Sequence, residues 1–376
     1  MKNTLYIFAL MFVLLSQSKA QVVITNSNFS LGTTGRIGIG LSPNGEGEQW
    51  KPLNLSGQGS LAGRMEQNDY MDLLPAIHFT PKLNGKDSTN VTFQVRLGMY
   101  SANGQFMGNV STRSPEGLTF ILPETYIEAR NILGSRWSAW TGVRFRRYDD
   151  IHICDYFYFD DHSAQGAGFS YKNTEIAVYI PSSSDSSGVY PYNYKVTVAG
   201  ATNPAIRQRK VLVGEHSIDF QDGSVLKFLG EFHHVAASSK NASVAYAADY
   251  GWVAGVKLNS PIKTRMPDSF NQLSVRYGAG IANGGDNGNT WTWATYGAPD
   301  ADGKYTNAYS ITAVEHFLLN LNKKFSINGY GVYTHSRGGA DSDNKALYFN
   351  GTELYNQKTD VVVGARTLFY ATKWLN

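Results

Sequence analysis

Residues 150–160 contain side chains that could do chemistry, namely carboxylates, a histidine and aromatic rings. Asp150, His152 and Asp155 precede four consecutive aromatic residues, 156–159, and Asp160 follows them. Two carboxylates beside a histidine suggest hydrolysis or metal binding, although these aspartates do not complete a zinc-like ligand set. The same groups could instead exchange hydrogen bonds with the hydroxyls of a solute while the rings cover its apolar faces. An external loop has little use for four adjacent aromatic rings.

The residues that precede this segment alternate as a strand does. Arg144 and Arg146 share one parity, whereas Val143 and Phe145 share the other. Residues two apart lie on the same face of a strand. An arginine on a lipid-facing surface near mid-bilayer costs about 2–4 kcal/mol. We therefore expect Arg144 and Arg146 to line a water-filled interior and Val143 and Phe145 to face lipid.

The first residues read as an export signal. Lys2 precedes an apolar run over residues 5–15, and a small-x-Ala cleavage pattern ends at Ala20. This apolar core is too short to cross a bilayer as a helix, and no run of about 20 apolar residues follows it. We expect residues 1–20 to be a signal peptide and residues 21–376 to form one outer-membrane β-barrel domain.

The composition excludes several classes of protein. The 33 basic and 30 acidic residues nearly balance, which argues against a nucleic-acid partner. Cys154 is the single cysteine, so the chain has no intrachain disulfide and no cysteine-rich metal site. We expect no metal and no cofactor. The 23 tyrosines, 19 phenylalanines and 38 glycines favour strands, in either a soluble sandwich or a membrane barrel.

Alternating segments recur along the chain. Residues 91–100 alternate most cleanly, and Asp222-Gly223 predicts a tight turn inside the segment 211–235. Long loops rich in glycine and asparagine separate other segments, and no candidate covering helix is present. We expect about fourteen strands, give or take two. Short turns at one end and long loops at the other are typical of outer-membrane barrels.

The segment after Arg146 resembles a motif of the maltoporin family, the sugar-specific outer-membrane porins. Its form there is D-x-H-x-x-D-[FY]-x-Y, carried here by Asp150, His152, Asp155, Tyr156 and Tyr158 and followed by Gly166-Ala167-Gly168. Weaker similarities cover residues 29–40, 270–278 and 363–366. The resemblance implies an all-β, transmembrane antiparallel β-barrel with an inward-folded constriction loop. It also implies a homotrimer in the outer membrane of a Gram-negative-type bacterium.

The resemblance implies a set of pore-lining residues for carbohydrate solutes. In this family, aromatic rings form a slide for the apolar faces of sugars, while charged groups exchange hydrogen bonds with the hydroxyls. The positions that match, or that the strand alternation adds, are Tyr70, Phe270 and Phe157 as rings, Arg36, Arg64, Arg144 and Arg146 as cations, and Asp150, His152 and Asp155 in the constriction loop.

Several positions depart from the family pattern. Thr33, Tyr148 and Pro123 stand where the family has a slide tyrosine and two track arginines, and Phe157 lacks the hydroxyl of the family's tyrosine. The passing solute could therefore be a maltodextrin or another small sugar. The family continues for about four further strands after the match to residue 376. The chain is thus either a smaller barrel or a shortened one, and we expect the latter.

Three functions compete. The leading one is facilitated diffusion of carbohydrates through an outer-membrane channel, with lipid as the surrounding partner. The alternative is a non-conducting surface barrel that acts as an adhesin or as a binding or structural protein. An outer-membrane hydrolase is third, and the match of residues 150–160 to a transport loop argues against it, so we expect no enzymatic activity.

Overall fold

One antiparallel sheet of 15 strands dominates the computed structural model. The structure describes residues 18–25, 28–36, 70–81, 88–101, 118–146, 150–151, 156–157, 159, 162–180, 195–196, 205–206, 209–237, 247–264, 266–283, 297, 300, 304–340, 346–349 and 352–369. The strands of the main sheet are, in spatial order, β1 (Ser18–Thr25), β2 (Phe29–Arg36), β3 (Tyr70–Phe79), β4 (Asn90–Ser101), β5 (Leu118–Arg130), β6 (Trp137–Arg144), β9 (Ala164–Tyr171), β10 (Thr174–Ile180), β13 (Arg209–Asp219), β14 (Val225–Val235), β15 (Asp249–Pro261), β16 (Phe270–Gly280), β17 (Tyr309–Asn320), β18 (Phe325–Arg337) and β21 (Gln357–Phe369).

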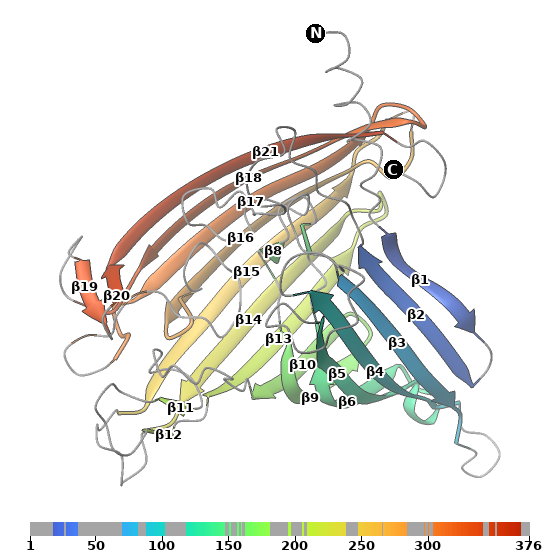
Figure 1. Ribbon diagram of the computed structural model, residues 1–376, viewed down its shortest axis with the longest axis horizontal. Coiled ribbons are helices and arrows are strands. Elements are labelled where there is room, and N and C mark those ends of the chain that lie inside the picture. The colour runs from blue at the N-terminus through green and yellow to red at the C-terminus, as the bar shows by residue number, and fades with distance from the viewer. Residues whose placement is uncertain are drawn as a thin grey trace.

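Each strand of the main sheet pairs with the next one along it, and the sheet curves strongly (Figure 1). Among the described residues, β1 and β21 form its two edges. Three small hairpins lie apart from it: β7 (Asp150–Ile151) with β8 (Tyr156–Phe157), β11 (Lys195–Val196) with β12 (Ala205–Ile206), and β19 (Ala346–Phe349) with β20 (Thr352–Tyr355). The all-β antiparallel fold expected from sequence is confirmed, and the main sheet has 15 strands within the described residues, where about fourteen were predicted.

The connections differ in length between the two ends of the strands. Short turns join β9 to β10, β13 to β14 and β17 to β18, whereas far longer segments join β2 to β3, β6 to β9 and β16 to β17. In the β13–β14 turn, Gly223 adopts a φ of 86°, which glycine tolerates without strain. The predicted Asp-Gly turn is therefore confirmed. The asymmetry of the connections is that of an outer-membrane barrel.

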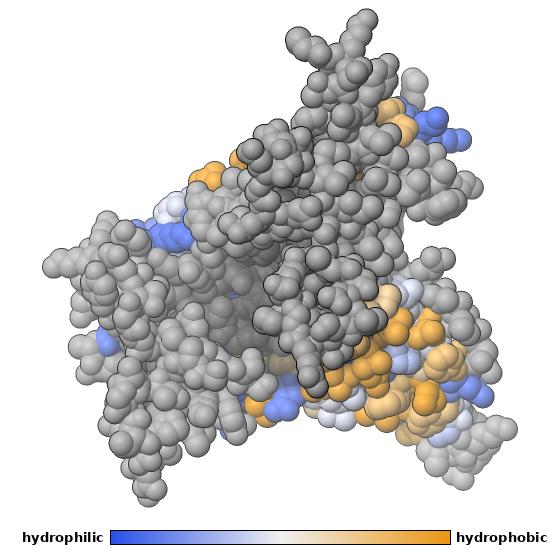
Figure 2. Space-filling model, viewed as in Figure 1, coloured by the Kyte–Doolittle hydropathy of each residue, from blue (hydrophilic) through white to orange (hydrophobic). Residues whose placement is uncertain are grey.

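Burial across the sheet is inverted relative to a soluble protein. The outer face exposes large apolar side chains such as Ile77, Phe93 and Leu212, while charged residues on the opposite face are buried. Figure 2 shows part of this apolar outer surface, at the lower right, where β1 to β6 lie in Figure 1. A surface of this kind is stable against lipid, because lipid tails cannot hydrogen-bond to polar groups.

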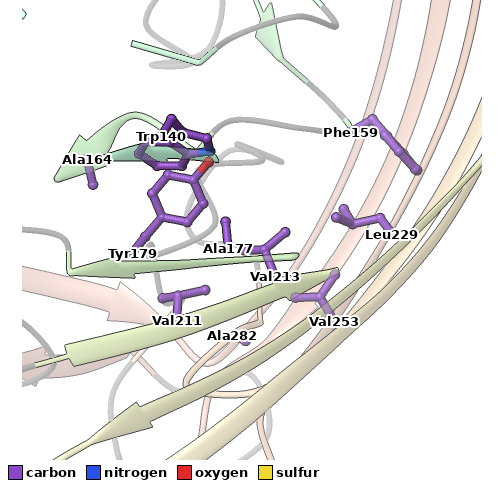
Figure 3. Packing of buried hydrophobic residues seen from close by; sticks show 10 residues of the cluster. All are labelled: Trp140, Phe159, Ala164, Ala177, Tyr179, Val211, Val213, Leu229, Val253 and Ala282. Atoms are coloured by element: carbon purple, nitrogen blue, oxygen red, sulfur yellow. The ribbon is translucent and has the colours of Figure 1, made fainter. Parts of the chain in front are cut away.

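A small apolar cluster lies on the inner face, between the sheet and the segment that follows β6. It contains Trp140, Phe159, Ala164, Ala177, Tyr179, Val211, Val213, Leu229, Val253 and Ala282. In Figure 3 the rings of Trp140 and Tyr179 point toward one another, and their centroids are 5.4 Å apart. Phe159 reaches Leu229 from outside the main sheet, so this cluster holds Phe159 against the inner face. None of the helices in the described part of the chain has the length and apolarity needed to cross a bilayer.

Candidate functional site on the inner face

Arg144, at the end of β6, is buried on the inner face of the sheet. Its guanidinium carbon lies 4.7 Å from the ring centroid of Tyr126 and 4.9 Å from that of Trp140. Glu128 on β5 approaches the same guanidinium, with a nitrogen–oxygen distance of 3.9 Å. Two rings and a carboxylate therefore fix the direction in which this cation can donate hydrogen bonds.

Arg146, two residues further on, contacts two strands. It donates to Glu175 Oε1 on β10 at 2.7 Å, to the Tyr179 hydroxyl at 3.2 Å and to Glu215 Oε2 on β13 at 3.1 Å. The indole of Trp140 also donates to Glu175 Oε1, at 3.1 Å. Because both carboxylates and the guanidinium are largely withdrawn from water, this arrangement is strong only while every partner is present.

The segment between Arg146 and His162 returns to the place where it started. The His162 amide donates to the Arg146 carbonyl at 3.0 Å, which closes the base of the loop. The His162 ring is fully buried, with Nδ1 at 3.3 Å from Glu215 Oε1 and Nε2 at 3.5 Å from Glu231 Oε1. Glu215 thus contacts both ends of the loop.

Phe159 lies on the inner face of the sheet. Its side chain has no exposed surface, and its ring lies against Leu229 and beside Gly255, on the inner face of β14 and β15 (Figure 3). The ammonium groups of Lys227 and Lys257 lie 5.8 Å and 5.5 Å from the ring centroid. These lysines face one another in the β14–β15 register. Phe159 therefore lies on the inner face of the sheet, and its ring is close to both cations.

A second set of charges continues the strip toward β16. His233 Nε2 donates to Glu231 Oε2 at 2.7 Å, and Arg209 donates both to His233 Nδ1 and to the carbonyl of Ile281, each at 2.7 Å. Arg276 on β16 lies 3.9 Å from Glu231. All of these charged side chains are buried. The inner face thus carries a continuous strip of alternating cations and carboxylates from β5 to β16.

Four of the predicted pore residues have described side chains. Tyr70 begins β3 and shares its face with the buried Asp72, while Phe270 begins β16, shares its face with the buried Ser274 and packs edge-on against His316 at 5.2 Å. The strand order places Tyr70 beside the long connections and Phe270 beside the short turns. Arg144 and Arg146 lie together in the strip.

Other predicted positions are only partly described. Arg36, Asp150 and Phe157 lie within strands β2, β7 and β8, but their side chains are outside the described part. Arg64, His152 and Asp155 lie outside the described residues altogether. In the described part of the chain, no three histidine, cysteine, aspartate or glutamate side chains form a group that could hold a metal ion.

The expectation that Phe145 faces lipid is wrong. Strand β6 ends at Arg144, and the ring of Phe145 lies 4.3 Å from the guanidinium carbon of Arg96 on β4. Arg96 in turn forms an ion pair with Asp72. Because strand alternation stops where the ladder stops, Phe145 is free to turn toward a cation, whereas Val143 within the strand is exposed as expected.

Sequence reasoning missed the residues that hold the loop. Glu175, Glu215 and Glu231 come from strands far along the chain, and Lys227 and Lys257 meet only through the β14–β15 register. Lys227 and Lys257 each lie between two apolar neighbours, so their inward direction was readable from the sequence. Which of these charges meet one another was not, because pairing depends on registers that no local pattern specifies.

The connection asymmetry, the inverted burial and the charged inner strip define an outer-membrane porin, a channel rather than an enzyme. The LamB porin family model matches residues 29–376, and the chain belongs to that family. The chain is 23% identical over 359 residues to a maltoporin of Vibrio cholerae serotype O1, El Tor Inaba N16961, a match that covers 93% of this chain and 75% of the relative. The maltoporin of the classical strain Ogawa 395 is equally similar, with 74% of the relative covered.

A solved structure is also similar in part. It is an anion-selective porin from Comamonas acidovorans, with 12% sequence identity and a TM-score of 0.36. The match covers 81% of this chain and 90% of that chain.

Proposed function

We propose that this porin passes small carbohydrates by facilitated diffusion across the outer membrane. The observation that carries the proposal is the inner strip, where guanidinium groups and carboxylates alternate beside aromatic rings. Arg144 between the rings of Tyr126 and Trp140 is the clearest unit of it. A sugar presents hydroxyls at its rim and an apolar face, so this combination can replace water without a large penalty.

The pore-lining set extends beyond the strip. We assign Tyr70, Phe270 and Phe157 as rings that contact the sugar, and Arg36, Arg64, Arg144 and Arg146 as hydrogen-bond donors. Asp150, His152 and Asp155 are assigned to the constriction, where residues 150–160 narrow the passage. The inward position of Phe159 supports this assignment. Each contact must be weak and repeated, because a channel must release what it binds.

Sugar-blockable conductance in planar bilayers tests this function. Maltose, maltotriose and sucrose should each reduce the open-channel current in a concentration-dependent way, and the concentration for half block identifies the preferred sugar. A matched polyol of similar size that lacks a ring, such as sorbitol, is the control. A conducting pore that no sugar blocks contradicts the carbohydrate assignment, and a barrel without conductance favours the binding or adhesin alternative.

We further propose a homotrimer and a cleaved signal peptide of residues 1–20. The trimer rests on membership of the LamB porin family. Native gels and light scattering of detergent-purified protein should give three chains per particle, and monomers alone would contradict this. Mass spectrometry of the exported protein should find Gln21 at the amino terminus, which removes the first three residues of β1.

A further inference from the structure

The outer face of the sheet carries a belt of aromatic side chains near the long connections. Phe232 contacts Tyr250, with ring centroids 6.0 Å apart, and Trp252 contacts Tyr277 at 5.4 Å. The belt continues to Tyr309, which stacks on Tyr277 at 6.2 Å. Aromatic rings gather where hydrocarbon meets headgroups. This belt therefore marks the headgroup level of the outer leaflet, since the long loops of such barrels face outward.

A groove of about 300 Å³ opens within this belt. Three aromatic rings, Lys304 and Thr306 are among its lining residues, which are Phe232, Ala248, Asp249, Tyr250, Gly251, Trp252, Ala279, Gly280, Lys304 and Thr306. The three rings are each about half exposed. The groove is thus accessible from the membrane side and combines apolar walls with one ammonium group.

The segment that carries Lys304 is held in place. The Lys304 amide donates to Asp300 Oδ1 at 2.8 Å, and the Asp300 amide donates to the Lys304 carbonyl at 2.7 Å. The next amide, that of Tyr305, donates to Asp249 Oδ2 at 2.8 Å. Asp249 Oδ1 accepts the amide of Tyr250, so both oxygens of this carboxylate are engaged. The one acid in the groove wall is therefore occupied by backbone donors.

The Lys304 ammonium has no comparable partner among the described residues. Its side chain makes no hydrogen bond or ion pair with any described residue, in contrast to the lysines of the inner strip. On the neighbouring strands, His234 lies directly across from Tyr250 in the ladder, and Lys210 lies across from His234 on the next strand; both add basic character to the outer face. Anionic groups are attracted to such a cationic rim at a membrane surface.

From these observations we infer that the groove between Trp252 and Lys304 binds a phosphate-bearing glycolipid of the outer leaflet. The phosphate meets the Lys304 ammonium, and the adjoining acyl chain lies along Phe232 and Trp252. A preformed groove needs little ordering on binding, which favours a resident lipid over a transient one. The inference rests on the outer-membrane location and not on sugar passage, so sugar block and lipid binding can fail separately.

Native mass spectrometry with bisphosphorylated lipid A tests this inference on the full-length protein. Lys304→Ala should weaken lipid A binding at least fivefold, while Lys304→Arg should retain it. Lys323→Ala, in the exposed β17–β18 turn at the opposite end of the strands, is the matched control and should bind as the unaltered protein does. The single-channel ion conductance of all variants should be unaltered, which shows that each one is folded.

Four outcomes would overturn the inference. If Lys304→Ala and the unaltered protein bind lipid A equally well, the Lys304 ammonium is not part of the site. If the protein binds lipid A and its fully dephosphorylated form equally well, the phosphate does not contribute to binding. Competition by millimolar inorganic phosphate, without any contribution from acyl chains, reassigns the groove to a free anion. Disulfide formation between copies carrying Trp252→Cys in a Cys154→Ser background would show that another chain covers the groove.

Discussion

Arg146 donates a hydrogen bond of 3.1 Å to Glu215, which lies 69 residues further along the chain. The same carboxylate lies 3.3 Å from His162 at the other end of the loop. One side chain on β13 therefore connects both ends of an inward-folded segment to the wall of the porin. Arg146 and His162 are held by ionic contacts and Phe159 is held by packing against Leu229, and the two attachments can be broken separately.

Removal of the charge at Glu215 should loosen the base of the loop. Loss of one partner from a buried ionic contact costs about 3–5 kcal/mol. We expect Glu215→Gln to lower the unfolding midpoint in urea and to increase current fluctuations in planar bilayers. Asp268→Asn, in an exposed turn, is the control and should change neither. Quiet, unaltered currents in a folded Glu215→Gln protein would contradict this role.

Removal of the ring at Phe159 should release the second attachment. Phe159→Ala abolishes its contacts with Leu229, Lys227 and Lys257, so we expect a higher single-channel conductance. Gly255→Leu should do the same from the other side, because even a Cβ at Gly255 would lie 2.9 Å from the Phe159 ring. Phe169→Ala removes a ring from the outer face and serves as the control. Equal conductance of all four proteins would show that residues 150–160 do not narrow the pore.

Thiol labelling checks the direction of side chains at the end of β6. In a Cys154→Ser background, cysteines at positions 144, 145 and 146 should react with a membrane-impermeant reagent, and one at position 143 should not. Position 145 belongs to the reactive group because Phe145 contacts Arg96 rather than facing outward. Protection of positions 144 and 146 in reconstituted vesicles would refute the inner strip.

The ring of Phe270 should contribute to sugar block. An aromatic contact is worth about 0.5–1.5 kcal/mol beyond area burial, which corresponds to about 2–12-fold in binding. We expect Phe270→Ala to raise the half-blocking sugar concentration by that factor, and Phe270→Tyr to leave it near that of the unaltered protein. If sugar block is undiminished in Phe270→Ala, the Phe270 ring is not part of the aromatic slide.

The β13–β14 turn should add a small pH dependence to stability. The Ser224 amide donates to Asp222 at 2.9 Å and lowers the pKa of that carboxyl below its ordinary value. The contribution is therefore present above the ordinary pKa of aspartate and is lost as the pH falls through the lowered pKa. Urea unfolding of Asp222→Ala at pH 7 and pH 3 should lack this component, whereas Asp268→Ala should retain it.

Much of this architecture was determined locally by the sequence. Alternation in residues 91–100 and around Arg144 specifies which face each side chain takes, because a strand has a period of two. Asp222-Gly223 specifies its turn, because glycine tolerates the positive φ that the backbone needs there. The concentration of acids and rings in residues 150–160 likewise indicated a loop with a task inside the molecule.

Only the tertiary structure decided which of these groups meet. Glu215 reaches Arg146 and His162, and Lys227 faces Lys257 across Phe159, because the registers of β10, β13, β14 and β15 align them. A shift of one residue in any register would turn those charges toward lipid, yet no nearby residues encode the choice. Phe145 shows the same limit at a strand end: once the ladder stops, the position of a side chain is decided by the partner it finds.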